Sequence, residues 1–189
     1  MRAYAEKLAE QIDQSQPFIL IGASLGGMLA TEMTAFIKPK CTIIISSAKN
    51  RRELPFRYRF QKHFPVYKLV PAVLVKFGAK ILQPLVELDR NKEKAIFKAM
   101  LNDKDPKFLS RTVHMIVNWK RTNYPENIIH IHGDNDHTLP IKNVNYDHLI
   151  EGGSHMMSLT RAMEINQLIL DILTAKGPFK NKTIVSFLP

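Results

Sequence analysis

A strand, a sharp turn and a helix follow one another directly near the start of the chain. Four apolar residues at 18–21 predict a strand that is buried on both faces. Residues 22–26 read Gly-Ala-Ser-Leu-Gly and fit the pattern G-x-S-x-G, and an apolar-periodic helix is expected from there to about residue 37. Such a turn raises a serine hydroxyl above the end of a sheet, where it can act as a nucleophile. The alternative is a glycine-rich turn in which Ser24 only caps the helix.

Further apolar segments predict the rest of the sheet. Residues 41–46, 127–133 and 146–150 are expected to be strands, and a helix joins the first two strands of the chain into a right-handed parallel unit. Helices are predicted at residues 2–14 and 158–174. We therefore expect an α/β domain whose parallel sheet has about four strands and helices on both faces. Residues 183–188 fit either a strand or a loose arm.

The middle of the chain has a different character. Residues 49–125 mix apolar and basic side chains at helical spacing, with six prolines among them and no convincing strand. We predict that this segment is a helical cap inserted into an α/β core made of residues 1–48 and 126–189. The net charge of +10 arises between residues 51 and 120. Because the basic residues are scattered among apolar ones, we interpret them as a solvated surface and expect no nucleic-acid partner.

Composition limits the compartment in which the chain works. The chain has 189 residues and one cysteine, Cys41, so no disulfide can form within it, which favours a reducing compartment. The first residues lack the apolar stretch of a secretory signal, and no apolar run is long enough to span a bilayer. We expect a cytoplasmic protein without a stable membrane anchor.

Polar residues follow the last two predicted strands of the core. Asp134 and Asp136 come directly after the third strand, and His155 follows the fourth. Since the carboxyl ends of parallel strands meet at one edge of a sheet, these residues are expected beside Ser24. A serine nucleophile needs a base, and that base needs an orienting acid. Either aspartate fits the acid, although each also fits an Asx-turn, and His155 also fits a helix cap.

A second motif on the third strand suggests a metal site. His130-Ile-His132-Gly-Asp134-Asn135 resembles H-x-H-x-D-H, the signature of two-metal hydrolases, but its last position is Asn. No further His or Asp follows at ligand spacing, and a metal would leave Ser24 and His155 unexplained. We therefore predict no metal, and we interpret His130 and His132 as packing or supporting residues.

Taken together, the segments 22–27, 132–136 with Pro140, and 152–155 resemble the α/β-hydrolase superfamily, in particular its capped, esterase-like members. The resemblance covers residues 2–174. It implies that Asp136 is the acid of an H-G-x-x-D pattern, with Asp134 second, and that His155 is the base. The Leu25 amide would be one oxyanion-hole donor. The implied activity is a serine hydrolase that cleaves carboxylic esters, or thioesters, of small molecules through an acyl-enzyme and without a cofactor.

One feature departs from that family. Complete members carry roughly four strands and a helix before the nucleophile turn, whereas here one helix precedes strand 18–21. The absent part would include the loop that supplies the second oxyanion amide. The strand at 18–21 is then expected to have one neighbour at most. This predicts that the isolated chain either self-associates through the free edge or needs a separate N-terminal fragment, and that it is weakly active when alone. The alternative function is a non-catalytic or weakly active truncated α/β-hydrolase-like protein that binds a ligand or partner.

Overall fold

A parallel sheet forms the centre of the computed structural model, which describes residues 1–69, 99, 105–175 and 183–187. In this part of the chain the sheet has five strands in the order β4-β3-β2-β1-β5, and every neighbouring pair is parallel. The strands are β1 (Phe18–Ala23), β2 (Cys41–Ile45), β3 (Ile128–Gly133), β4 (His148–Ile150) and β5 (Thr183–Phe187). The parallel α/β class predicted from the sequence is therefore confirmed.

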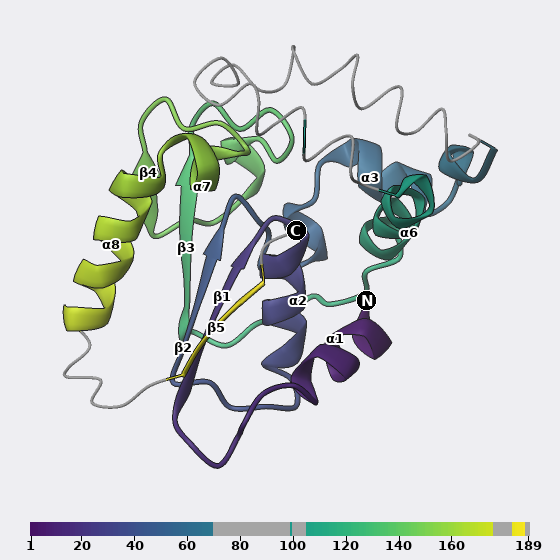
Figure 1. Ribbon diagram of the computed structural model, residues 1–189. Helices are drawn as coiled ribbons and strands as arrows, with labels where there is room; N and C mark the ends of the chain where they lie inside the picture. The colour runs from purple at the N-terminus through teal and green to yellow at the C-terminus, as the bar shows by residue number, and fades with distance from the viewer. Residues whose placement is uncertain (70–98, 100–104, 176–182, 188–189) are drawn as a thin grey trace.

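Helices cover both faces of the sheet (Figure 1). On one face α2 (Leu25–Met33) packs on β1 and β2, and α1 (Arg2–Ala9) packs against α2. On the other face α7 (Met157–Thr160) and α8 (Ala162–Ala175) share an apolar cluster with the inner strands. All five residues of β2 are buried, as expected for a strand covered on both faces. The core is therefore a three-layer arrangement with β1 and β2 at its centre.

The last described strand corrects two of our expectations. β5 pairs with β1 in register from Phe18 opposite Thr183 to Gly22 opposite Phe187. The sheet thus has five strands where about four were expected. The prediction that residues 18–21 lie at a free edge is wrong, because β2 and β5 occupy both sides of β1. Self-association through that edge has lost its structural basis.

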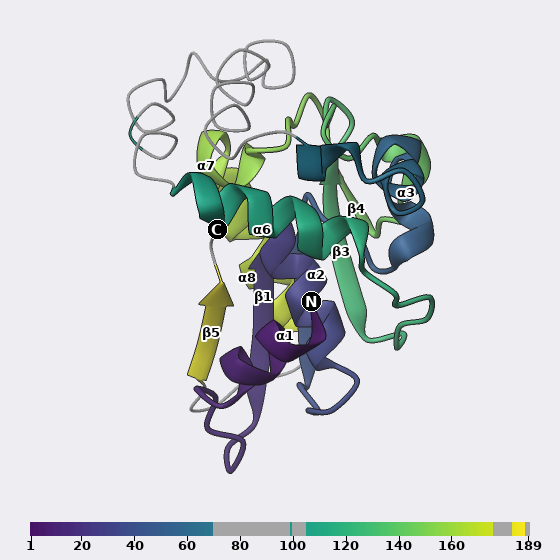
Figure 2. The same cartoon turned by 90° about the vertical axis from the view of Figure 1, so that its right-hand side faces the viewer.

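Part of the predicted cap lies in the described residues. It contains η1 (Arg51–Glu53), α3 (Phe56–Gln61), η2 (Val66–Leu69) and α6 (Pro106–Val117), and these described pieces include no strand. Figure 2 shows α6 crossing near the start of α2. Residues 70–98 and 100–104 of the predicted cap lie outside the described residues, so its boundaries at 49 and 125 stay a prediction. In the described part, no helix is both long and apolar enough to cross a membrane.

Candidate active site

The turn between β1 and α2 holds Ser24 in a strained conformation. Its φ is 49° and its ψ is −119°, in the left-handed half of conformational space that residues with a Cβ rarely adopt. A Cβ on Gly22 would collide with the backbone of Gly26, so glycine is required where the strand and helix meet. Ser24 N donates to the Ile45 carbonyl at 2.9 Å, and Ser47 Oγ donates to the Ser24 carbonyl at 2.7 Å. Neighbouring β2 thereby stabilises the turn.

A row of hydrogen bonds starts at the Ser24 hydroxyl. Ser24 Oγ lies 2.9 Å from His155 Nε2, and His155 Nδ1 lies 2.8 Å from Asp136 Oδ2. The Asp136 side chain is fully buried, while the His155 side chain is 10% exposed. Leu25 begins α2, so its N–H has no earlier helical carbonyl to bind and needs an acceptor from elsewhere. The fold thus brings together the serine, histidine and aspartate that the sequence singled out, although they are far apart in the chain.

The two candidate aspartates have different partners. Asp134 Oδ1 accepts the Gly152 N–H at 2.6 Å and so holds the loop that carries His155. Asp136 contacts His155 itself through Oδ2, while its Oδ1 accepts the N–H groups of Thr138 at 2.9 Å and Leu139 at 2.7 Å. The Asx-turn alternative and the acid role are therefore compatible, because each uses a different oxygen of Asp136.

The electrostatic surroundings keep Asp136 ionised. Burial alone raises the pKa of Asp136, but the charge and hydrogen bond of His155, helped by the Leu139 N–H, lower it further than burial raises it. The net pKa of Asp136 lies below its ordinary value. An ionised carboxylate accepts the His155 Nδ1 proton, which leaves the lone pair of Nε2 facing Ser24 Oγ. The row is thus arranged for proton transfer from serine to histidine.

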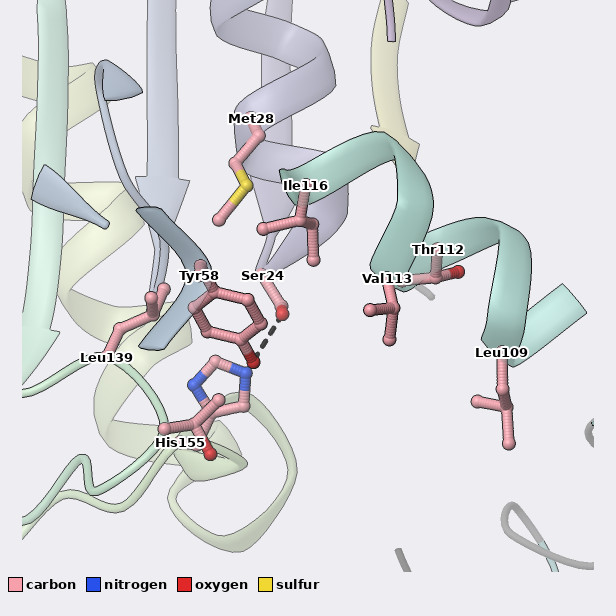
Figure 3. A pocket seen from close by; sticks show the side chains of 10 residues that line it. Ser24, Met28, Tyr58, Leu109, Thr112, Val113, Ile116, Leu139 and His155 are labelled. Atoms are coloured by element: carbon pink, nitrogen blue, oxygen red, sulfur yellow. Dashed lines mark hydrogen bonds between the residues drawn. The ribbon is translucent and has the colours of Figure 1, made fainter. Parts of the chain in front are cut away.

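A cavity of about 230 Å³ opens beside Ser24 and His155. In Figure 3 the Tyr58 ring lies next to the serine–histidine pair, and α6 contributes the opposite wall. Among the described residues its lining contains no Asp, Glu, Lys or Arg and consists of Ser24, Met28, Tyr58, Leu109, Thr112, Val113, Ile116, Thr138, Leu139 and His155. The sequence analysis did not single out the α6 residues, although their spacing of three and four marks one face of a helix.

His130 and His132 are fully buried on β3. Their ring nitrogens His130 Nε2 and His132 Nδ1 lie 3.0 Å apart. Within the residues that the structure describes, no three His, Cys, Asp or Glu side chains are grouped to hold a metal ion. Burial lowers the pKa of both histidines, that of His130 to about 3. Both rings are therefore neutral at pH 7.

Because His130 and His132 are buried as neutral rings, we predict that the folded protein loses stability when the pH is lowered. Folded His130 stays neutral down to about pH 3, whereas the unfolded chain protonates it near pH 6.5. Below pH 6.5 the unfolded state binds more protons than the folded state. The free energy of unfolding should therefore decrease as the pH is lowered, by up to about 1.4 kcal/mol per pH unit for this group. Urea unfolding of the wild type and of His130→Gln at pH 7, 6 and 5 measures the effect. The variant should show a shallower dependence, and equal slopes would contradict the prediction.

This chain is similar to known proteins in structure rather than in sequence. No protein-family model matches the sequence, and no curated protein is significantly similar to it. Solved structures do match. A thermophilic esterase from Thermogutta terrifontis is similar over 92% of this chain and 72% of its own, with a TM-score of 0.68 and 14% identity.

Two further solved structures are similar to this chain. The meta-cleavage product hydrolase from Pseudomonas fluorescens IP01 matches 90% of this chain and 69% of its own, with a TM-score of 0.61 and 14% identity. MenH from S. aureus matches 92% of this chain and 74% of its own, with a TM-score of 0.52 and 14% identity. At these identities the similarity concerns the fold. Together with the strand–turn–helix around Ser24 and the sheet order, it shows that this chain has the α/β-hydrolase fold.

Proposed function

We propose that this protein is a serine hydrolase that cleaves carboxylic esters. The observation that carries the proposal is the hydrogen-bonded row of Ser24, His155 and Asp136 at the mouth of an apolar cavity. A strained serine turn, a histidine nitrogen at hydrogen-bond distance from the hydroxyl and a buried carboxylate behind it are the parts that nucleophilic acyl transfer requires. That two of the similar structures are described as an esterase and a hydrolase agrees with this chemistry.

The proposed reaction has two halves. Ser24 Oγ attacks the ester carbonyl while His155 Nε2 takes the hydroxyl proton, and Asp136 stabilises the resulting imidazolium. The negative charge that develops on the carbonyl oxygen is stabilised by the Leu25 N–H. The tetrahedral intermediate then expels the alcohol, which takes the proton from His155. In the second half His155 deprotonates a water, the water attacks the acyl group on Ser24, and the serine recovers its proton as the acid leaves.

The cavity favours a small, uncharged substrate. Its volume of about 230 Å³ is below the range of about 300–1,000 Å³ that is usual for sites of drug-sized ligands. Its apolar walls from α3 and α6 would bind a short acyl chain by burying it, while a charged acyl group would find no side chain of opposite charge among the described lining residues. Short-chain carboxylic esters are therefore the substrates that we propose, and thioesters of the same size are included.

Covalent labelling tests the proposal. A fluorophosphonate probe reacts with activated serines, and it should modify the wild-type chain at Ser24, identified by mass spectrometry of the peptide. p-Nitrophenyl acetate, butyrate and octanoate should then be hydrolysed with kcat/KM falling as the acyl chain lengthens. If Ser24 stays unlabelled and no ester is hydrolysed, the alternative of a non-catalytic ligand-binding protein replaces the proposal. If the octanoate is the best substrate, the proposed size limit of the cavity is wrong.

A further inference from the structure

The mechanism above leaves two buried histidines on β3 unused. His130 and His132 occupy alternate positions of β3, so both rings lie on the same face of the sheet. Both residues have no exposed surface. Burying an imidazole without hydrogen-bond partners is costly, and interior positions on a strand of this kind normally hold Val or Ile. A pair of buried histidines directly before the loop that carries Asp136 therefore needs a physical explanation.

The two rings form a continuous row of polar contacts that ends at the turn from Asp136 to Leu139, which we call the acid loop. His130 Nδ1 lies 2.9 Å from the Asn145 carbonyl oxygen, and His130 Nε2 lies 3.0 Å from His132 Nδ1. His132 Nε2 lies 2.8 Å from the Leu139 carbonyl oxygen and 3.6 Å from Asp136 Oδ2. His132 thus touches the acid loop at two places, a backbone carbonyl and the carboxylate.

Counting protons assigns the direction of each contact. A carbonyl oxygen only accepts, so His130 Nδ1 donates to Asn145 and His132 Nε2 donates to Leu139. The Ser47 N–H, 3.4 Å from His130 Nε2, agrees that this nitrogen accepts. Two neutral rings supply two protons for three contacts, so the two nitrogens that face each other both present lone pairs. If the proton of His132 were on Nδ1 instead, the lone pair of Nε2 would face the Leu139 carbonyl oxygen and Asp136 Oδ2. That contact with two acceptors is less favourable than the single contact between the two ring nitrogens.

The arrangement fixes the two peptide groups on either side of the Leu139 Cα. Its N–H donates to Asp136 Oδ1 at 2.7 Å, and its carbonyl accepts from His132 Nε2 at 2.8 Å. Asp136 reaches His155 with its other oxygen. A shift of the Leu139 backbone would therefore turn the carboxylate of Asp136 and lengthen its contact to His155. Displacements of about 1 Å in such a row cost about 10²-fold in rate.

We propose that His132 is a positioning residue for the hydrolase proposed above: its Nε2–H holds the turn from Asp136 to Leu139 so that the carboxylate stays against His155, and His130 orients the His132 ring. His132 touches no substrate in this assignment and acts through Asp136. The inference rests on the proposed function for its effect on rate, but the effect on His155 is a property of the folded chain alone.

Two amide substitutions separate positioning from packing. The amide nitrogen of His132→Gln falls near the place of Nε2 and keeps a donor toward Leu139, whereas that of His132→Asn falls near Nδ1 and leaves the Leu139 carbonyl without its donor. We expect His132→Asn to lower kcat by about 10–100-fold with little change in KM. His132→Gln should stay within a few-fold of the wild type. His148→Asn, on neighbouring β4, serves as the matched control and should leave kcat unchanged.

An NMR titration of the His155 ring supplies a readout that does not need activity. With Asp136 less well placed, the imidazolium of His155 is less stabilised, so its midpoint should move to lower pH in His132→Asn and stay near the wild-type value in His132→Gln. The acid limb of the pH profile of kcat/KM should move in the same way. An unchanged or raised midpoint in His132→Asn, or a lowered one in folded His132→Gln, overturns the assignment. If the variants show these midpoint shifts but the wild type hydrolyses no ester, the proposed function is rejected and the positioning role of His132 stands.

Discussion

Replacing Ser24 with alanine should reduce ester hydrolysis to near the uncatalysed background. The hydroxyl is the proposed nucleophile, and nothing else at the turn between β1 and α2 can form an acyl-enzyme. In a serine protease the loss of such a serine, or of its histidine, costs about 2 × 10⁶ in kcat. We expect Ser24→Ala and His155→Ala each to cost at least about 10⁴-fold, and the double variant to be no worse than either single one, because the two residues act as a unit.

Steady-state kinetics with p-nitrophenyl acetate measure this loss. Ser15→Ala is a suitable control, since Ser15 is exposed and bonds only to the neighbouring Asp13 among the contacts described. Thermal unfolding of each variant shows whether the fold is kept. A Ser24→Ala chain that retains a tenth of the wild-type rate would exclude an acyl-enzyme at Ser24, and a background-level wild type would exclude the enzyme altogether.

The second large effect is expected at Asp136 rather than Asp134. An asparagine at 136 keeps the shape of the side chain, but its amide nitrogen would donate to His155 Nδ1. That contact places the ring proton on Nε2, where it blocks proton transfer from Ser24. We expect Asp136→Asn to cost about 10⁴ in kcat, by analogy with the aspartate of serine proteases. Asp134→Asn keeps an oxygen that can accept the Gly152 N–H, so its cost should be below about tenfold.

The two asparagine variants control for each other, because they make the same chemical change two residues apart. Their kcat values with the same ester, measured at several pH values, give the comparison. A larger loss in Asp134→Asn would mean that the acid has been assigned to the wrong residue. Equal small losses would mean that His155 does not depend on a carboxylate, and the acyl-transfer mechanism would need another orienting group.

Local sequence patterns were sufficient for much of the core. Strand 18–21 and strand 41–46 were predictable because a strand buried on both faces is apolar throughout, and the glycines at 22 and 26 mark where strand and helix approach. The convergence of Ser24, Asp136 and His155 followed from parallel topology, which places the carboxyl ends of strands at one edge. The structure agrees with that geometry, while the catalytic roles stay predictions.

Other features depend on contacts between distant segments, which no local pattern encodes. The segment 183–187 was recognised as a possible strand, but the partner of a strand is set by tertiary packing, so its place beside β1 was missed. Choosing Asp136 over Asp134 rested on the family pattern, because both follow the strand by a few residues. The walls of the cavity form because α3 and α6 both lie beside Ser24. The spacing of apolar residues within each helix does not predict that the two helices lie there.

The pairing of β1 with β5 has a consequence for how this protein is made. Phe18 pairs with Thr183, so β1 obtains its second neighbour from a segment that the ribosome adds 183 − 18 = 165 residues later. At about 5–20 residues per second, on the order of ten to thirty seconds separate the synthesis of the two strands. During that interval one side of β1 lacks its native partner, and the nascent chain exposes a row of unpaired N–H and C=O groups. Contacts of such high sequence separation also slow folding. Until residues 183–187 have been made, the unpaired edge of β1 is where we expect a chaperone to bind.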